Sequence, residues 1–171
     1  MIAVPICAKT TKEAVEKMKK GEKFADIFEI WLDQMEQCDI SQIRKATNRP
    51  IIVVNKGTKE KGAFRGAEKE RINRLMTAKK QGADFIDIGI QTEKSLMEKL
   101  IKAPGKAEII ISYHNFSKTP SIPELEKIGK QALNLGADII KIAVFPKTAK
   151  DIEKFPIIAK KWRKMGRKYI I

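Results

Sequence analysis

The chain has 171 residues, enough for one domain with a hydrophobic core, and its 43% hydrophobic and 33% charged residues are typical of soluble proteins. Its net charge of +14 attracts anions, but the lysines alternate with acids and no RNP motif, zinc finger or aromatic stacking platform accompanies them. Nucleic acid is therefore not an expected partner. The apolar runs are only as long as a strand, so we expect no contact with a membrane. No secretory signal opens the chain, so we expect a cytoplasmic location.

Short β-branched runs alternate with longer charged segments of helical period, a pattern typical of βα units around a parallel sheet. In chain order, the predicted strands are Ile2–Cys7, Asp26–Trp31, Pro50–Asn55, Asp84–Ile88, Glu108–Tyr113 and Asp138–Val144, and a seventh starts in Lys168–Ile171. The predicted helices are Lys12–Lys20, Ile40–Ala46, Gly66–Gln81, Glu93–Ile101, Pro123–Leu135 and Thr148–Met165. We therefore predict an α/β fold with a (β/α) TIM-barrel-like parallel sheet. Residues 1–171 would form a single truncated barrel domain of six to seven strands.

An internal repeat links the second, fourth and sixth predicted strands, which each start with Ala-Asp followed by a hydrophobic pattern. In a (β/α) barrel, alternate strands fill the same interior layer, so Glu29, Asp87 and Lys141 should converge at one depth. An ionisable residue in such an apolar strand is costly unless it is paired. Lys141 is therefore a candidate functional residue, and the alternative is a buried structural ion pair with Glu29 or Asp87.

His114 is the only histidine and lies at the carboxyl end of the fifth predicted strand, directly after Tyr113, where barrel enzymes place catalytic residues. Its ordinary pKa suits proton transfer near neutral pH. Lys141 lies on the next strand, and a desolvated lysine near other cations loses its proton readily and attacks carbonyls. The resulting Schiff base would let His114 remove a proton from the neighbouring carbon. A class I aldolase would also fit this pair.

A metal site is not predicted. One histidine and two separated cysteines, Cys7 and Cys38, provide no cluster at ligand spacing. We expect reduced, structural cysteines and no cofactor.

Two segments carry a specific resemblance. Ile111–Pro120 and Gly136–Ala143 closely resemble the histidine and lysine motifs of type I 3-dehydroquinate dehydratases. The resemblance implies a lyase of the shikimate pathway to aromatic amino acids, which converts 3-dehydroquinate to 3-dehydroshikimate and water. It implies that Lys141 forms the Schiff base with the substrate ketone and that His114 is the general acid and base.

The resemblance extends to the second and third predicted strands. Glu60 matches a glutamate near the catalytic histidine, and Glu29 matches a substrate-binding glutamate. Lys56 stands where the family has an arginine, so it keeps the charge but loses the bidentate fork of a guanidinium. Trp31 also stands where an arginine is usual, and Gly89 replaces a usual acid. The family's eighth strand and final loops, which bind the substrate carboxylate, have no counterpart after Ile171.

Two other functions stay open beside this one. A degenerate, non-catalytic barrel could act as an anion-binding or interaction protein, with the basic stretch Lys160–Lys164 as a contact surface. The second alternative is a different Schiff-base enzyme, of the class I aldolase type. The expected partners are a small anionic substrate, 3-dehydroquinate, and a second copy of the chain. A homo-oligomer is expected because unpaired parallel sheet edges favour association.

Overall fold

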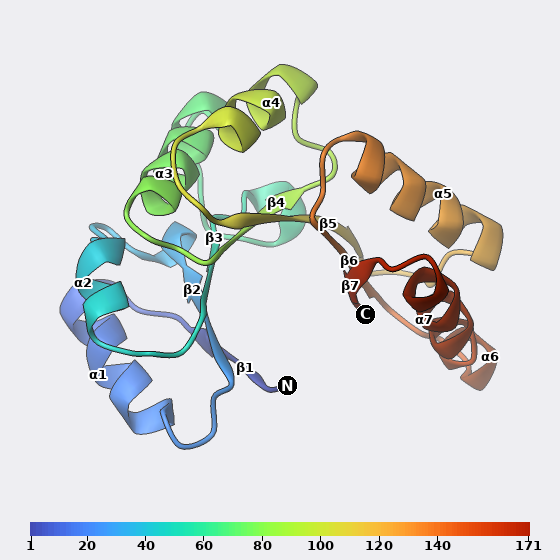
Figure 1. Ribbon diagram of the computed structural model, residues 1–171, viewed down its shortest axis with the longest axis horizontal. Helices are drawn as coiled ribbons and strands as arrows, with labels where there is room; N and C mark the ends of the chain where they lie inside the picture. Colours follow the sequence, from blue (N-terminus) through green and yellow to red (C-terminus); the bar gives the residue numbers. More distant parts are fainter.

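A computed structural model describes all residues 1–171 and contains one seven-stranded sheet in the order of the sequence (Figure 1). Every neighbouring pair of strands is parallel. The strands are β1 (Ala3–Ile6), β2 (Ile27–Trp31), β3 (Ile51–Val54), β4 (Phe85–Gly89), β5 (Glu108–Asn115), β6 (Ile139–Val144) and β7 (Lys168–Ile170). The α/β prediction of an incomplete (β/α) barrel is thus confirmed, with seven strands.

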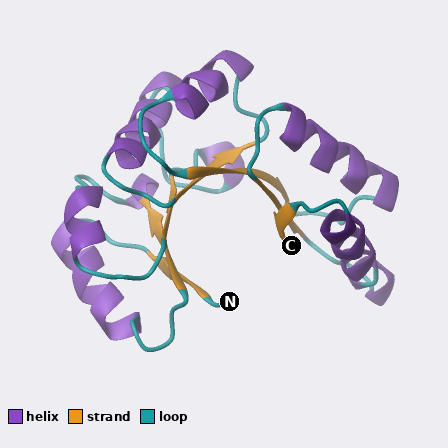
Figure 2. Cartoon of the chain, in the orientation of Figure 1, coloured by secondary structure: helices purple, strands orange, loops and turns teal.

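The helices cover the outer side of the curled sheet (Figure 2). They are α1 (Thr11–Gly21), α2 (Ile40–Lys45), α3 (Glu68–Lys80), α4 (Lys94–Lys102), α5 (Ile122–Asn134), α6 (Ala149–Ile152) and α7 (Lys154–Lys164), and two short 3-10 turns, η1 (Leu32–Gln34) and η2 (Thr58–Glu60), follow β2 and β3. The prediction of one final helix was wrong, because the chain turns at Glu153 and starts a new helix. Pro156 explains the break, since its ring would clash with the carbonyl of Ile152 in a continuous helix.

The Ala-Asp repeat has a structural role at the amino ends of the strands. The carboxylates of Asp26, Asp84 and Asp138 accept hydrogen bonds from the backbone N–H groups of Ile2 (2.6 Å), Ile51 (2.8 Å) and Ile109 (2.8 Å), respectively. Each aspartate therefore ties its strand to the strand before it. These bonds fix the register on which the position of every interior side chain depends.

Two hydrophobic clusters lie on opposite sides of the sheet. The larger one, with 31 buried residues, fills the space between the sheet and the helices. The smaller one lies inside the curl and consists of Ile27, Ile52, Val54, Ile110 and Ile139. This apolar interior layer forms the floor beneath the polar side chains described below.

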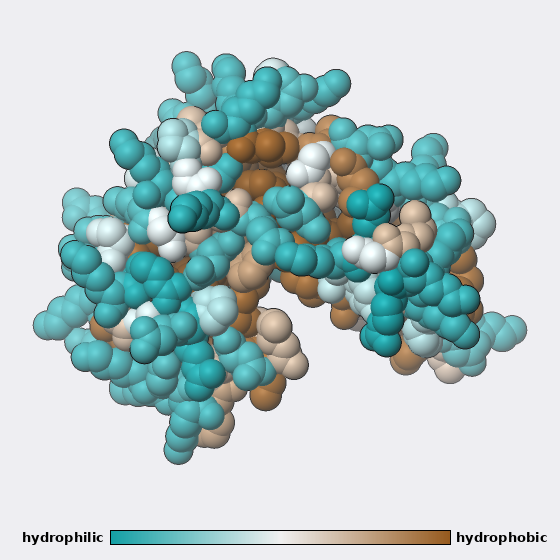
Figure 3. All heavy atoms as spheres, in the orientation of Figure 1, coloured by the Kyte–Doolittle hydropathy of each residue, from teal (hydrophilic) through white to brown (hydrophobic).

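The barrel wall is open between β1 and β7, which do not pair (Figure 1). The molecule is hollowed on this side, and apolar atoms are exposed towards the hollow (Figure 3). A cavity of about 760 Å³ lies there, lined mainly by hydrophobic residues that include Ala3 of β1 and Ile170 of β7. None of the helices is both long and apolar enough to cross a lipid bilayer.

Candidate active site

The inner side of the sheet turns polar two residues beyond its apolar floor. On four strands, a polar residue follows a residue of the floor by two positions: Glu29 after Ile27 on β2, Asp87 after Phe85 on β4, Ser112 after Ile110 on β5 and Lys141 after Ile139 on β6. Because alternate residues of a strand share one face, these four side chains point into the curl on the carboxyl-end side of the floor.

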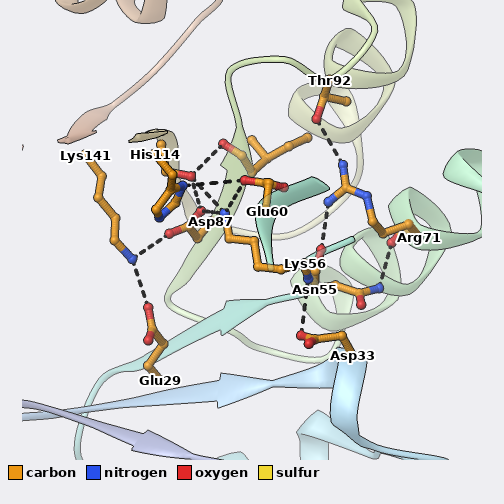
Figure 4. A network of polar contacts seen from close by, with 12 residues as sticks. Glu29, Asp33, Asn55, Lys56, Glu60, Arg71, Asp87, Thr92, His114 and Lys141 are labelled. Atoms are coloured by element: carbon orange, nitrogen blue, oxygen red, sulfur yellow. Dashed lines mark hydrogen bonds and ion pairs between the residues drawn. The ribbon is translucent and has the colours of Figure 1, made fainter. Parts of the chain in front are cut away.

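Lys141 lies between two carboxylates, as the repeat predicted. Its Nζ is 2.8 Å from Oδ2 of Asp87 and 3.0 Å from Oε1 of Glu29 (Figure 4). Asp87 is completely buried, whereas the Lys141 side chain is 17% exposed. The lysine is therefore held by the protein and still reachable from the open mouth.

The charge state of Lys141 differs from the expectation. Burial would lower the pKa of Lys141, but Asp87 and Glu29 outweigh burial and raise this pKa well above its ordinary value. The predicted low pKa required neighbouring cations, and the groups in contact with the Nζ are carboxylates instead. The resting Lys141 is an ammonium, so its nitrogen can attack a carbonyl only after Lys141 has lost a proton.

Lys56 lies on the other side of Asp87 from Lys141. Its side chain is only 4% exposed, so it is almost as buried as Asp87. Its Nζ donates to Oδ1 of Asp87 (2.6 Å), the hydroxyl of Ser112 (2.8 Å) and Oε1 of Glu60 (3.2 Å). An ammonium has three N–H donors, so protein groups use all of them. Lys56, expected to bind substrate, could do so only by giving up one of these bonds.

Asp87 thus has one lysine on each carboxylate oxygen. Burial would raise the pKa of Asp87, but Lys56 and Lys141 hold this pKa well below its ordinary value. Asp87 is therefore an anion that fixes two ammonium groups and is a poor acceptor for a proton.

Glu60 reaches His114 from the η2 turn. Its Oε1 is 3.6 Å from Nδ1 of His114, longer than a normal hydrogen bond, and this buried Nδ1 has no other polar partner. Burial raises the pKa of Glu60, but His114 and Lys56 lower it below its ordinary value. A carboxylate in this position favours a proton on the Nδ1 atom, which would leave Nε2 free to act as a base.

Gly89 provides the space for Glu60. A Cβ atom at this position would lie 2.5 Å from Oε1 of Glu60, which is too close for any real contact. The sequence showed Gly89 only as a missing acid, whereas the structure shows that its lack of a side chain admits the carboxylate of Glu60.

His114 and Lys141 lie on the same side of the sheet. Lys141 is paired in register with Ser112, and His114 follows Ser112 by two residues. The His114 ring also stacks on the ring of Phe116, with centroids 5.9 Å apart. The structure therefore brings Glu60, His114 and Lys141 to one mouth (Figure 4). Glu29 contacts Lys141 from β2, across the inside of the curl, rather than from the same wall as predicted.

Trp31 and Ser112 are the site residues that the sequence did not assign. The indole Nε1 of Trp31 donates to Oε2 of Glu29 at 3.0 Å, so the residue in the arginine position orients the carboxylate that holds Lys141. Ser112 donates to Oδ1 of Asp87 at 2.6 Å. Its place two residues before His114 on the same strand face was the available signal.

The carboxylates of the site are engaged by lysines, and no group of three or more His, Cys, Asp or Glu side chains is arranged to hold a metal ion. What the site offers chemically is an amine, an imidazole and a set of fixed carboxylates.

Known proteins resemble this chain over nearly its whole length. The sequence model of the family described as Type I 3-dehydroquinase matches residues 2–168. The 3-dehydroquinate dehydratase of Methanococcus vannielii is 35% identical over 166 residues, which are 95% of this chain and 75% of that protein. The 3-dehydroquinate dehydratase of Methanothermobacter thermautotrophicus is 35% identical over 154 residues, 88% of this chain and 68% of that protein.

Solved structures agree in fold. The type I 3-dehydroquinate dehydratase of Clostridium difficile, solved with covalently modified comenic acid, superposes with a TM-score of 0.83 at 22% identity, over 94% of this chain and 69% of that one. The 3-dehydroquinate dehydratase of Enterococcus faecalis gives a TM-score of 0.74 at 27% identity, over 89% of this chain and 69% of that one. A protein described as QR15, an aldolase, gives only 0.61 at 15% identity, covering 92% of this chain and 74% of that one.

Proposed function

The chain belongs to the type I 3-dehydroquinase family, and we propose that it dehydrates 3-dehydroquinate to 3-dehydroshikimate through a Schiff base on Lys141. The observation that carries the proposal is the placement of Lys141 and His114 on one side of the sheet, on neighbouring strands at the open mouth. A single small ketone could then meet the amine and the imidazole together.

The reaction starts with the loss of a proton from Lys141. Glu29 is the better placed acceptor, because its carboxylate contacts Lys141 and no second cation, whereas Asp87 is stabilised as an anion by Lys56. The neutral amine adds to the ketone carbon, and Glu29 returns its proton to the carbonyl oxygen, which leaves as water. The product is a protonated imine, which attracts electrons from the neighbouring carbon.

His114 then removes a proton from the carbon beside the imine, and the electron pair forms a carbon–carbon double bond. The hydroxyl group on the next carbon departs with a proton returned by His114, so this step releases water. Hydrolysis of the imine frees the product ketone and restores Lys141. Glu60 would act through His114, by favouring the tautomer with a free Nε2.

Lys56 contributes in this proposal by holding Asp87 and Glu60 rather than by touching the substrate. Its three bonds keep two carboxylates in place, one beside Lys141 and one beside His114. Residues 1–171 would act as one domain, in which β2, β4, β5, β6 and the segment after β3 contribute to the site.

The alternatives are less well supported. The likeness to the aldolase QR15 is one of fold alone, while the family match covers residues 2–168. A non-catalytic barrel would not need an amine and an imidazole on one side of the sheet with carboxylates beside them. The basic stretch Lys160–Lys164 lies on α7, which covers the outer side of the sheet (Figure 2).

Borohydride trapping tests the proposal directly. Adding 3-dehydroquinate and sodium borohydride should reduce the imine to a stable adduct on Lys141, located by mass spectrometry of peptides. The Lys141→Ala variant should give no adduct, whereas Lys130→Ala, which removes an exposed lysine on α5, should react like the unmodified protein.

The His114→Ala variant separates imine formation from proton removal. It should still be trapped by borohydride but should form 3-dehydroshikimate about 10²–10⁴-fold more slowly, the usual contribution of a general base. Absence of both adduct and product absorbance at millimolar substrate in the unmodified protein would exclude the proposed activity.

A further inference from the structure

A cavity of about 500 Å³ lies beside Lys141 at the carboxyl end of the sheet. Eight of its eleven lining residues are hydrophobic, and none is Asp or Glu. The remaining three are Lys61, Asn115 and Lys141. Such a lining fits a molecule with a carbon ring and a negative charge, because a few polar groups in an apolar pocket fix the orientation of a ligand.

Lys61 is a cation without a carboxylate partner. It takes part in none of the ion pairs of the protein. Its Nζ instead lies 4.2 Å from the centroid of the Phe116 ring, and Phe116 stacks on His114. The Lys61 ammonium is therefore held on the wall of the mouth that carries His114.

The loop that presents Lys61 is fixed at both ends. Asp33 accepts hydrogen bonds from the backbone N–H groups of Lys56 (3.2 Å) and Ala63 (2.9 Å). Lys61 itself has a φ of 60° and is the only non-glycine residue with positive φ. This conformation is unfavourable for a lysine and common for glycine, and such strain occurs most often at functional sites.

We propose that Lys61 binds the carboxylate of the substrate while Lys141 reacts with the ketone, an inference that rests on the proposed function. 3-Dehydroquinate is a ring carboxylate, and its ketone would consume the amine of Lys141. Lys61 is then the one remaining cation that lines the cavity. No Asp or Glu side chain lines the cavity to compete for the Lys61 ammonium.

Three variants separate this role from a structural one. Lys61→Gly removes the ammonium and suits the positive φ, so the midpoint of thermal unfolding should not fall. Lys61→Arg keeps the charge. Lys59→Gly is the matched control, because Lys59 is an exposed lysine of the same turn that does not line the cavity.

Steady-state kinetics should show a five- to tenfold higher KM for 3-dehydroquinate in Lys61→Gly, about the size of a partly exposed charge–charge contact, with kcat changed less than twofold. Lys61→Arg should restore KM to within about twofold, and Lys59→Gly should leave it unchanged. Added salt should raise the KM of the unmodified protein more than that of Lys61→Gly, because it screens the contact.

Calorimetric binding of quinate, which has the ring carboxylate and lacks the ketone, tests Lys61 independently of turnover. Weaker quinate binding in Lys61→Gly than in Lys59→Gly supports the carboxylate contact even if the protein forms no adduct, in which case only the proposed activity fails. Equal quinate binding in these two variants overturns the role of Lys61, even if borohydride traps the substrate on Lys141.

Discussion

The Nζ of Lys56 lies 2.6 Å from Oδ1 of Asp87, and both side chains are almost completely removed from solvent. A buried charge that loses its partner is strongly destabilising, because the low-dielectric interior cannot replace the interaction. We expect Lys56→Met to lower the free energy of unfolding by about 3 kcal/mol, measured by urea denaturation. Lys59→Met, on the exposed surface, should change it by less than about 0.5 kcal/mol. An unchanged stability in Lys56→Met would mean that the pair is solvated.

The same network predicts how stability depends on pH. The pKa of Asp87 is lower in the folded protein than in an unfolded chain, so its carboxylate stabilises the fold above the unfolded pKa of about 3.9 and loses this effect as the pH falls. The raised pKa of Lys141 affects stability at high pH. The Lys141 ammonium stabilises the fold fully below the unfolded pKa of about 10.4, and this stabilisation is lost as the pH rises further. Burial also raises the pKa of the Cys38 thiol to about 12, so its contribution is lost as the pH rises above the unfolded pKa of about 8.5. Stability should therefore be nearly constant from about pH 5 to 8.

Urea denaturation at a series of pH values checks both ends of this range. The free energy of unfolding should fall by an amount of order 1–3 kcal/mol as the pH is lowered from about 5 to 2. Lys56→Met should lose part of this acid dependence, since the pKa of Asp87 rises when one of its two lysines is removed. Identical acid dependence in both proteins would contradict the assignment to Asp87.

Trp31 should affect catalysis through Glu29. Trp31→Phe keeps the aromatic packing but removes the N–H donor to Oε2 of Glu29, so kcat/KM for 3-dehydroquinate should fall about three- to tenfold, the typical net size of one hydrogen bond. In a Glu29→Gln background the same substitution should have a smaller effect, because the contact has already been altered. Additive losses in the double variant would show that Trp31 acts independently of Glu29.

The open edges of the sheet should favour association of two or more copies. The outer edges of β1 and β7 are unpaired, and the exposed side chains of Ile2, Ile170 and Ile171 lie beside them. Light scattering should give a molar mass above that of one chain, and the mass should rise with added salt because the net charge of +14 opposes assembly.

A charge on the β7 edge should reduce this association. Ile170→Lys places an ammonium beside the unpaired strand, whereas Ile157→Lys places one on an exposed position of α7 and serves as the control. Equal masses for these two variants, or a monomer at high salt for the unmodified protein, would be the contrary result.

The sequence by itself determined the strands and the interior layer. The alternation of β-branched and helical segments was enough to predict all seven strands, and the Ala-Asp repeat placed Glu29, Asp87 and Lys141 at one depth. Both inferences depend on the two-residue period of a strand, which is a local property of the chain. The candidate pair His114 and Lys141 followed because the carboxyl ends of parallel strands meet at one edge.

Only the tertiary structure decided the charge states of the site residues and which side chains pair with one another. Lys56 and Asp87 are 31 positions apart in the sequence, and Lys141 and Glu29 are 112 apart, so their contacts depend on strand register and on the path of the loops. These contacts make Lys141 an ammonium rather than the expected free amine. The same loop geometry directs Glu60 towards His114 and Lys61 into the cavity, because atoms about 3 Å apart set a pKa and no sequence period specifies such distances.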